Sequence, residues 1–222
     1  AVAVRALDDK GGVKGVLVFI GLFTSVTYSR SITDIPVLRR KADQVLAAFD
    51  ARPGSHDYKA LRHILEKYPR DELFQIKLSR LEKIIRSILV LQERRRIALY
   101  NRKDTFDRFI SCLVYVPRER YDSQLRATFQ DILEKDLRGT CSNFYTTLDD
   151  SPLARVMYVI DIDPANPPQY STAPIEKRLQ DAGAVWSEKL AEALLVKLAD
   201  GEKVAGLLTR YGNAFPSGYQ DH

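Results

Sequence analysis

The side chains that could do chemistry in this chain do not form a known catalytic set. The sequence contains no Ser-His-Asp arrangement, no Cys/His spacing for a metal, no phosphate-binding loop and no dinucleotide fingerprint. His56 and His63 have no cysteine or carboxylate partners at metal-binding spacing, so we expect solvated or capping roles for them. The glycines at positions 11, 12, 15 and 21 fit neither phosphate-binding pattern. We therefore expect no catalytic, cofactor-binding or metal-binding residues here.

The best candidates for binding are Arg118, Arg120 and Tyr121, in the run Pro-Arg-Glu-Arg-Tyr of residues 117–121. This run connects an apolar strand to an amphipathic helix. Arginine and tyrosine are enriched at protein–protein contacts. We predict that these three residues contact either a protein interface or a bound effector.

The two cysteines, Cys112 and Cys141, favour a reducing compartment. Cys112 lies inside an apolar strand, where a buried structural thiol is expected. A disulfide would be conceivable only if the strands 109–116 and 141–148 were neighbours. Nothing else suggests oxidation, no signal peptide opens the chain, and no apolar window is long enough to cross a bilayer. We expect a cytoplasmic protein without a membrane partner.

Positive charge is concentrated in one part of the chain. The net charge is +5, but residues 59–103 contain 13 basic and 5 acidic residues, a balance of +8. The basic segment 80–103 could bind a nucleic acid. The alternative is a solvated helix face whose arginines pair with acidic neighbours and with the helix C-terminus. No aromatic or glycine-rich readout module accompanies the segment, so we do not expect a nucleic-acid partner.

The second half of the chain predicts a small α+β sandwich. Residues 109–116 are an apolar run typical of a strand covered on both faces, and Pro117 ends it. Asp122 or Ser123 can cap the next helix, and Gly139 is placed to stop it. Further strands are expected at 96–100, 141–148 and 155–162, and one long helix at 174–198. This order of elements is a split β-α-β arrangement of the ferredoxin-like type.

The first half predicts a β-hairpin followed by helices. Two β-branched runs around Gly11 and Gly12 indicate a hairpin within residues 1–28, which would be marginal alone. Pro36 suits the first position of a helix. The other expected elements are helices within 31–67, a break at 69–75, a helix at 76–96, a helix at 201–211 ended by Gly212 and Asn213, and an extended linker at 214–222.

Five stretches together resemble the large, bacterial-type NAD-specific glutamate dehydrogenases. They are GLFTS (21–25), IPVLRRK (35–41), YPRDELFQ (68–75), RFISCLVYVPRERY (108–121) and YGNAFPSGY (211–219). The resemblance spans nearly the whole chain and implies four regions. These are a β-hairpin completing an upstream PAS-like sheet (1–30), a helical segment (31–95), an ACT-like domain of ferredoxin-like type (96–200), and a helix with a linker (201–222).

The resemblance also implies a function. The parent enzyme would oxidise L-glutamate with NAD to 2-oxoglutarate and ammonium, and its catalytic domain would lie C-terminal to this region. Because the chain begins at Ala1 and its only methionine is Met157, we expect an internal piece of such a protein. Its role would be regulation or assembly, as a homo-oligomer or docked on the catalytic domain of the same chain. An amino-acid effector is the alternative, although the connection 117–121 lacks the glycine common in effector-binding ACT domains.

Overall fold

A computed structural model describes residues 2–21, 23–198 and 200–211. The chain forms two compact units, residues 1–89 and 90–222. The division falls near the end of helix α5 (Leu78–Glu93). Each unit is built differently, the first from a hairpin and helices and the second around a four-stranded sheet.

The predicted hairpin is confirmed in the first unit. Strands β1 (Val2–Leu7) and β2 (Val13–Phe19) pair antiparallel. The Asp8 carboxylate closes the turn by accepting the backbone N–H groups of Lys10 and Gly12, at 2.9 and 2.7 Å. The neighbouring residues Val16 and Leu17 point to opposite faces of the hairpin, yet they are 55% and 58% exposed. Neither face of the hairpin is therefore buried.

Helices make up the rest of the first unit. They are α1 (Ser25–Ser29), the 3-10 turn η1 (Ile32–Asp34), α2 (Pro36–Ala48), α3 (His56–Lys67), α4 (Arg70–Gln75) and most of α5. Pro36 opens α2 as predicted, because a proline has no N–H to leave unpaired there. The buried residues of α2 and α3 recur at helical spacing: Leu38, Ala42, Val45 and Leu46, then Leu61, Ile64 and Leu65.

The break predicted at 69–75 is wrong, because α4 occupies it. Pro69 takes the N-cap position, so it begins a helix rather than interrupting one. In the first turn of α4, the Asp71 carboxylate accepts a 2.9 Å hydrogen bond from the hydroxyl of Tyr28. The Lys41 ammonium lies at the far end of α4 and donates to the carbonyls of Leu73 and Ile76, at 2.7 and 2.8 Å. A cation there is stabilised by the helix dipole.

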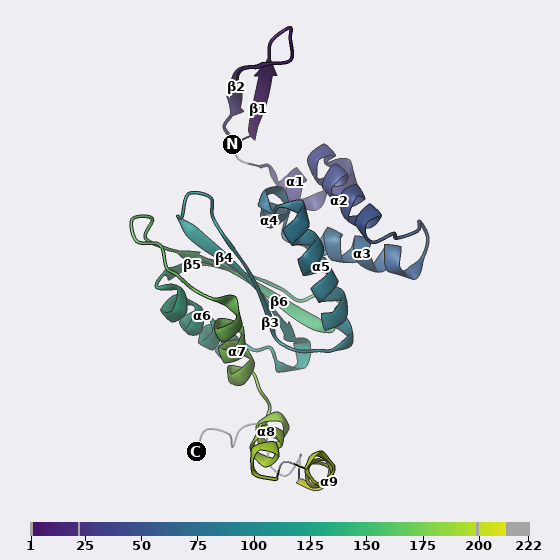
Figure 1. Ribbon diagram of the computed structural model, residues 1–222, viewed down its shortest axis with the longest axis vertical. Coiled ribbons are helices and arrows are strands. Elements are labelled where there is room, and N and C mark those ends of the chain that lie inside the picture. Colours follow the sequence, from purple (N-terminus) through teal and green to yellow (C-terminus); the bar gives the residue numbers. More distant parts are fainter. Residues whose placement is uncertain (1, 22, 199, 212–222) are drawn as a thin grey trace. The chain divides into compact units, whose positions relative to one another are not determined.

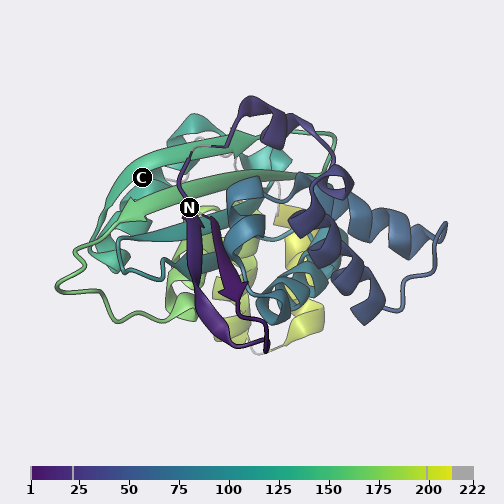
Figure 2. The same ribbon diagram turned by 90° about the horizontal axis from the view of Figure 1, so that it is seen from above.

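The second unit contains one antiparallel sheet in the order β3-β4-β6-β5 (Figure 1). Its strands are β3 (Ala98–Lys103), β4 (Phe109–Pro117), β5 (Thr140–Thr147) and β6 (Leu153–Asp161). Helices α6 (Ser123–Leu137) and α7 (Thr172–Ala182) lie side by side and pack on one face of it. The strands have the twist usual for such sheets, as Figure 2 shows from above. The predicted α+β class is confirmed.

The fourth place in the sheet is taken by a strand that precedes the split β-α-β unit. In a ferredoxin-like βαββαβ chain, the last strand pairs beside the first. Here β3 occupies that place, since it pairs antiparallel with β4 before the chain enters α6. The chain after α7 is therefore not needed by the sheet and is free to leave it.

The single helix predicted at 174–198 is wrong: α7 ends at Ala182 and α8 (Trp186–Leu198) begins after a short junction. Gly183 ends α7, and a Cβ at this position would lie 2.2 Å from Cδ1 of the buried Ile97. The helical pattern that looks continuous in sequence is therefore divided at Gly183, which lies close to Ile97, the residue before β3. Helix α9 (Gly201–Tyr211) is confirmed. The predicted stop at 212–213, the linker 214–222 and most of the motif 211–219 lie outside the described residues.

The core between the sheet and its two helices is apolar. It contains Cys112, Val114 and Val116 from β4, Val156, Tyr158 and Ile160 from β6, Phe129, Leu133 and Leu137 from α6, and Ile175 and Leu179 from α7. The hydroxyl of the buried Tyr158 donates to the backbone carbonyl of Arg126 in α6, at 2.9 Å. This bond satisfies the one polar atom that the tyrosine brings into the core.

The cysteines cannot form a disulfide within this sheet. Cys112 is fully buried in β4, as predicted, and neither cysteine is in a disulfide. Strand β6 lies between β4 and β5, so the backbones of Cys112 and Cys141 are about two strand spacings, roughly 9–10 Å, apart. A disulfide needs Cα atoms within about 7 Å. Burial also raises the pKa of the Cys141 thiol.

Different residues define the start and the end of helix α6. Asp122 caps the start of the helix, accepting the N–H of Leu125 at 2.7 Å. At the other end Arg138, not the predicted Gly139, adopts the left-handed conformation, with φ of 49°. Gly139 is needed for space, because a Cβ there would lie 2.4 Å from the carbonyl oxygen of Asp161.

Replacing Gly139 by alanine should destabilise the fold. The new methyl group would press on the backbone of β6, and such overpacking costs about 1–3 kcal/mol. Urea unfolding followed by circular dichroism measures the change. The matched control is Gly206→Ala in α9, whose Cβ would meet nothing within 4 Å. We expect the control to leave the midpoint unchanged or raise it, and equal midpoints for both variants would contradict the packing argument.

Tyr158 should make stability depend on pH in alkaline solution. Burial raises the pKa of the Tyr158 phenol above its usual value of 10. Above pH 10 the unfolded chain therefore loses this proton while the folded protein keeps it, so the free energy of unfolding falls by about 1.4 kcal/mol per pH unit from this group.

The variant Tyr158→Phe tests this. It should lose about 1 kcal/mol at neutral pH through the missing hydrogen bond, and its stability should fall less steeply between pH 10 and pH 12. The control is Tyr145→Phe, at a tyrosine that is 58% exposed. A slope equal to that of the unmodified protein would argue against a retained proton on Tyr158.

Candidate functional site

The connection between β4 and α6 is the site that the sequence singled out. The strand ends at Pro117, a 3-10 turn follows at Arg118–Arg120, and the Tyr121 N–H closes that turn on the carbonyl of Arg118 at 3.2 Å. Asp122 then caps α6. The turn and the cap hold the three candidate side chains on a short, well-defined piece of backbone.

Arg118 contacts the turn between β5 and β6. Its backbone N–H donates to the carbonyl of Pro152 at 3.0 Å, and its guanidinium donates to the carbonyl of Asp149. The Asp149 carboxylate in turn accepts the N–H of Ser151 at 3.0 Å. Arg118 therefore joins two loops at the same end of the sheet.

Arg120 contacts the junction between α7 and α8. Its two terminal nitrogens donate to the two carboxylate oxygens of Glu188, at 2.7 and 2.9 Å. One of these nitrogens also lies 3.4 Å from the carbonyl oxygen of Gly183. The Arg120 side chain is 19% exposed and that of Glu188 49% exposed. This is a bidentate pair of the geometry that arginine and carboxylate favour.

Tyr121 contacts the edge of the sheet. Its hydroxyl lies 2.9 Å from the hydroxyl of Thr146 in β5, and its ring packs against the core. Close by, the guanidinium of Arg126 lies 4.2 Å from the ring centre of Phe144 in β5, a cation–π contact. Two residues at the start of α6 thus bind side chains on β5.

The three predicted residues do not converge on one point. Arg118 reaches the β5–β6 turn, Arg120 the α7–α8 junction, and Tyr121 the strand β5. Their polar groups already have partners within the chain. The arrangement can therefore fasten separate elements together.

Sequence reasoning missed Glu188 because it treated residues 174–198 as one helix. Once the helix is divided, Glu188 is the third residue of α8, and its carboxylate accepts the N–H of Val185 at 3.3 Å. A glutamate at this position caps a helix by binding back to the residue before it. The available signal was Gly183 followed five residues later by an acid.

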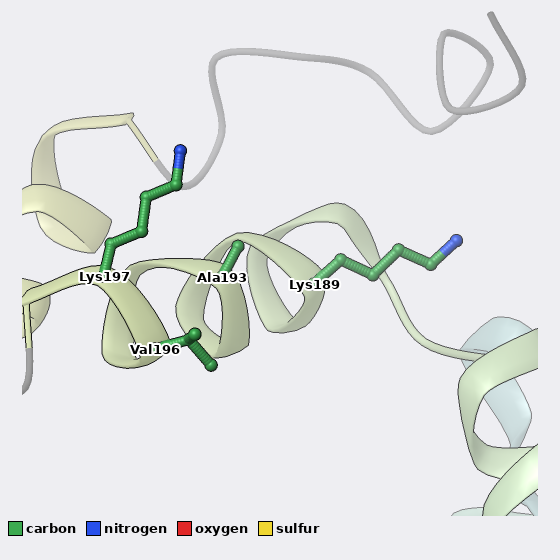
Figure 3. Close-up of a pocket in the computed structure, with 4 residues that line it drawn as sticks. All are labelled: Lys189, Ala193, Val196 and Lys197. Atoms are coloured by element: carbon green, nitrogen blue, oxygen red, sulfur yellow. The ribbon is translucent and has the colours of Figure 1, made fainter.

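A second feature is a surface hollow of about 420 Å³ along α8 (Figure 3). The described residues that line it are Lys189, Ala193, Val196 and Lys197. The two lysine side chains extend away from the helix, with the alanine and the valine between them. These four residues combine positive charge with apolar surface. None of the four has an acidic side chain or a hydroxyl or thiol group.

Two arginines of the basic segment contact aromatic rings within the fold. The guanidinium of Arg86 lies 4.4 Å from the ring centre of Phe49, and that of Arg102 lies 5.8 Å from the ring centre of Phe109. In the part of the chain that the structure describes, no cluster of three metal-ligating side chains is found. No helix among the described residues is long and apolar enough to span a bilayer.

Comparison with known proteins gives consistent matches along the chain. Family models of glutamate dehydrogenase match three regions: helical motif 1 at residues 35–94, the ACT2 domain at 98–187 and helical motif 2 at 194–222. The ACT2 match contains the whole sheet with α6 and α7. The helical motif 1 match contains the whole of α2, α3, α4 and α5.

Curated relatives cover the full chain but are much longer. The NAD-specific glutamate dehydrogenases of Halomonas elongata and Pseudomonas aeruginosa are 37% and 34% identical over 99% of this chain. That of Mycobacterium tuberculosis is 28% identical over 99%. The chain spans 14% of the length of each relative. The chain therefore belongs to the NAD-specific glutamate dehydrogenase family, and it corresponds to the stretch with helical motif 1, the ACT2 domain and helical motif 2.

Proposed function

We propose that this chain is a non-catalytic regulatory and assembly region of an NAD-dependent glutamate dehydrogenase. The parent enzyme would oxidatively deaminate L-glutamate to 2-oxoglutarate in the cytoplasm, with NAD bound outside this region. The partners would be the catalytic domain of the same chain and further copies of the protein. The observation that carries the assembly role is the exposed, uncharged edge of strand β5.

Strand β5 is the outer strand on one side of the sheet. Residues 141–147 of this strand include no charged side chain, and Phe144 and Tyr145 are 45% and 58% exposed. An outer strand offers a row of unpaired backbone groups, and proteins usually protect such an edge with charges, prolines or a covering element. The opposite outer strand, β3, ends in Arg102 and Lys103. The contrast supports β5 as the edge that a partner covers.

A second copy of the same strand would fit this edge. Two β5 strands related by a two-fold axis would run antiparallel and present the same surface to each other. No like charges would oppose each other across the new pair, because β5 is uncharged from Cys141 to Thr147. The contact would be supported by Arg118, Arg120 and Tyr121, since the hydroxyl of Tyr121 is hydrogen-bonded to the hydroxyl of Thr146 in β5.

An amino-acid effector at the β4–α6 connection has less support. The two guanidinium groups and the phenol that would recognise an amino acid are bound to Asp149, Glu188 and Thr146. An effector would have to displace these contacts.

The leading hairpin fits a role as the last part of an upstream PAS-like sheet. Both of its faces expose apolar side chains, and a two-stranded hairpin of this kind is not stable by itself in water. Additional strands would cover these side chains and pair with the hairpin edges.

A charge on the β5 edge should prevent self-association. We expect Tyr145→Lys to give a mass closer to the monomer than the unmodified chain, by light scattering over a concentration series, because each copy would bring a charged side chain into the uncharged contact. The control is Phe106→Lys, at a residue 72% exposed in the β3–β4 loop. A monomer at all concentrations without any substitution would overturn the assembly role.

The purified chain should neither reduce NAD in the presence of glutamate nor bind NAD. The physical reason is that its sequence offers no dinucleotide fingerprint, and the polar groups of the three candidate residues are bound to partners within the chain. Absorbance at the NADH band measures turnover, and calorimetric titration with NAD measures binding. Turnover above the level of a heat-inactivated sample would contradict the non-catalytic role.

A further inference from the structure

We infer that the ion pair between Arg120 and Glu188 is a latch that holds α8, and with it the start of helical motif 2, to the sandwich formed by β3–β6, α6 and α7. The inference deepens the proposed regulatory role and rests on it for its consequence in the parent enzyme. The latch itself rests on contacts within residues 117–198.

The pair has the geometry of a specific contact. Both oxygens of Glu188 accept hydrogen bonds from Arg120, at 2.7 and 2.9 Å, and the same guanidinium lies 3.4 Å from the Gly183 carbonyl oxygen. One oxygen of Glu188 also accepts the N–H of Val185. Two bonds in the plane of the guanidinium fix direction as well as distance. The start of α8 is thereby oriented against the β4–α6 connection.

The latch crosses the boundary between two regions of the family. The ACT2 match ends at residue 187 and the helical motif 2 match begins at 194, so Glu188 is the first residue beyond the ACT2 domain. Arg120 lies well inside that domain. Only residues 183–185 separate α7 from α8. A three-residue junction with a glycine can change direction with few torsion angles.

Other packing does not hold α8 in the same place. Helix α8 packs against α9, and among the described residues no comparable packing joins α8 to the strands or to α6 and α7. Among the described contacts, the α8–α9 pair is therefore joined to the sandwich mainly by the junction 183–185 and by the latch. Opening the latch would change the direction in which the chain leaves the ACT2 domain without disturbing the sandwich core.

The strength of the latch suits a reversible contact. Glu188 is half exposed, so water and salt weaken the pair, and contacts of this kind shift an equilibrium by roughly two- to fivefold. The sandwich core is apolar and does not share this sensitivity. The direction of α8 should therefore respond to ionic strength or to a competing carboxylate while the sandwich stays folded.

Hydrogen–deuterium exchange followed by mass spectrometry tests the latch in the 222-residue chain. The variant Glu188→Gln removes the charge but can still cap α8, since glutamine serves at this position too. We expect backbone amides in peptides covering α8 to exchange roughly two- to fivefold faster, with peptides covering α6 unchanged. The matched control is Asp107→Asn, which removes the surface pair with Lys103, 2.8 Å long, in the β3–β4 loop.

A double-mutant cycle identifies the pair as the cause. Arg120→Gln should speed exchange in α8 as much as Glu188→Gln does, and the double variant should add little to either. Raising the salt to 1 M should speed exchange in the unmodified chain but not in the double variant. Exchange in α8 equal to that of the Asp107→Asn control, or fully additive effects of the two substitutions, would overturn the latch.

Light scattering and hydrogen–deuterium exchange on the same samples distinguish the latch from the assembly role. The latch variants leave β5 intact, so their mass by light scattering should equal that of the unmodified chain. A monomeric chain with a normal exchange response would end the assembly proposal and leave the latch standing. An oligomer whose α8 exchange does not respond to the substitutions would end the latch proposal and leave the assembly proposal standing.

Discussion

The burial of strand β4 on both faces is the constraint on which the second unit depends. Every residue of this strand after Phe109 is buried, so the strand must lie inside the sheet with covered faces. Strands β3 and β6 pair with its two edges, and α6 and α7 cover the face with Cys112, Val114 and Val116. Because β3 fills the place beside β4 from the N-terminal side, no later strand is required. The chain after α7 is thus released towards helical motif 2.

Polar contacts act at the rim of this core rather than within it. Tyr158 makes the one hydrogen bond from the core centre to α6 described above, while the residues of the β4–α6 connection hold the turn after β5, the strand β5 and the start of α8. Arginine and tyrosine suit this task because they combine apolar stems with polar ends. The same chemistry is used between proteins, which is why these residues suggested an interface.

The two proposals rest on two features, the edge of β5 in the ACT2 domain and helix α8 at the C-terminal boundary of that domain. The edge of β5 is uncharged and exposed, and α8 carries exposed apolar residues such as Val196. The edge fits a contact that lasts, because backbone hydrogen bonds and aromatic side chains would be buried together. The α8 junction fits a contact that changes, because a short hinge and one solvent-exposed ion pair define it. An assembly surface and a movable exit would then lie on the same small domain.

The sequence by itself determined the elements whose residues carry strong local signals. The apolar run of β4, the Pro36 start of α2, the Asp122 cap of α6 and the glycine turn of the hairpin are local properties, and all were predicted correctly. The motif 108–121 and its neighbours also identified the family.

Only the tertiary structure decided the features that depend on distant neighbours. Helical periodicity continues through residues 174–198, but α7 ends at Ala182, and Gly183 lies close to the side chain of Ile97 in the chain leading to β3. The partner of Arg120 follows from that break, since Glu188 reaches the guanidinium only when α8 starts anew. Pro69 begins α4. At the end of α6 Arg138 adopts the left-handed conformation, and Gly139 leaves the space needed beside β6. Contacts between residues far apart in the chain leave no periodic signal, and for that reason the site had to be read from the fold.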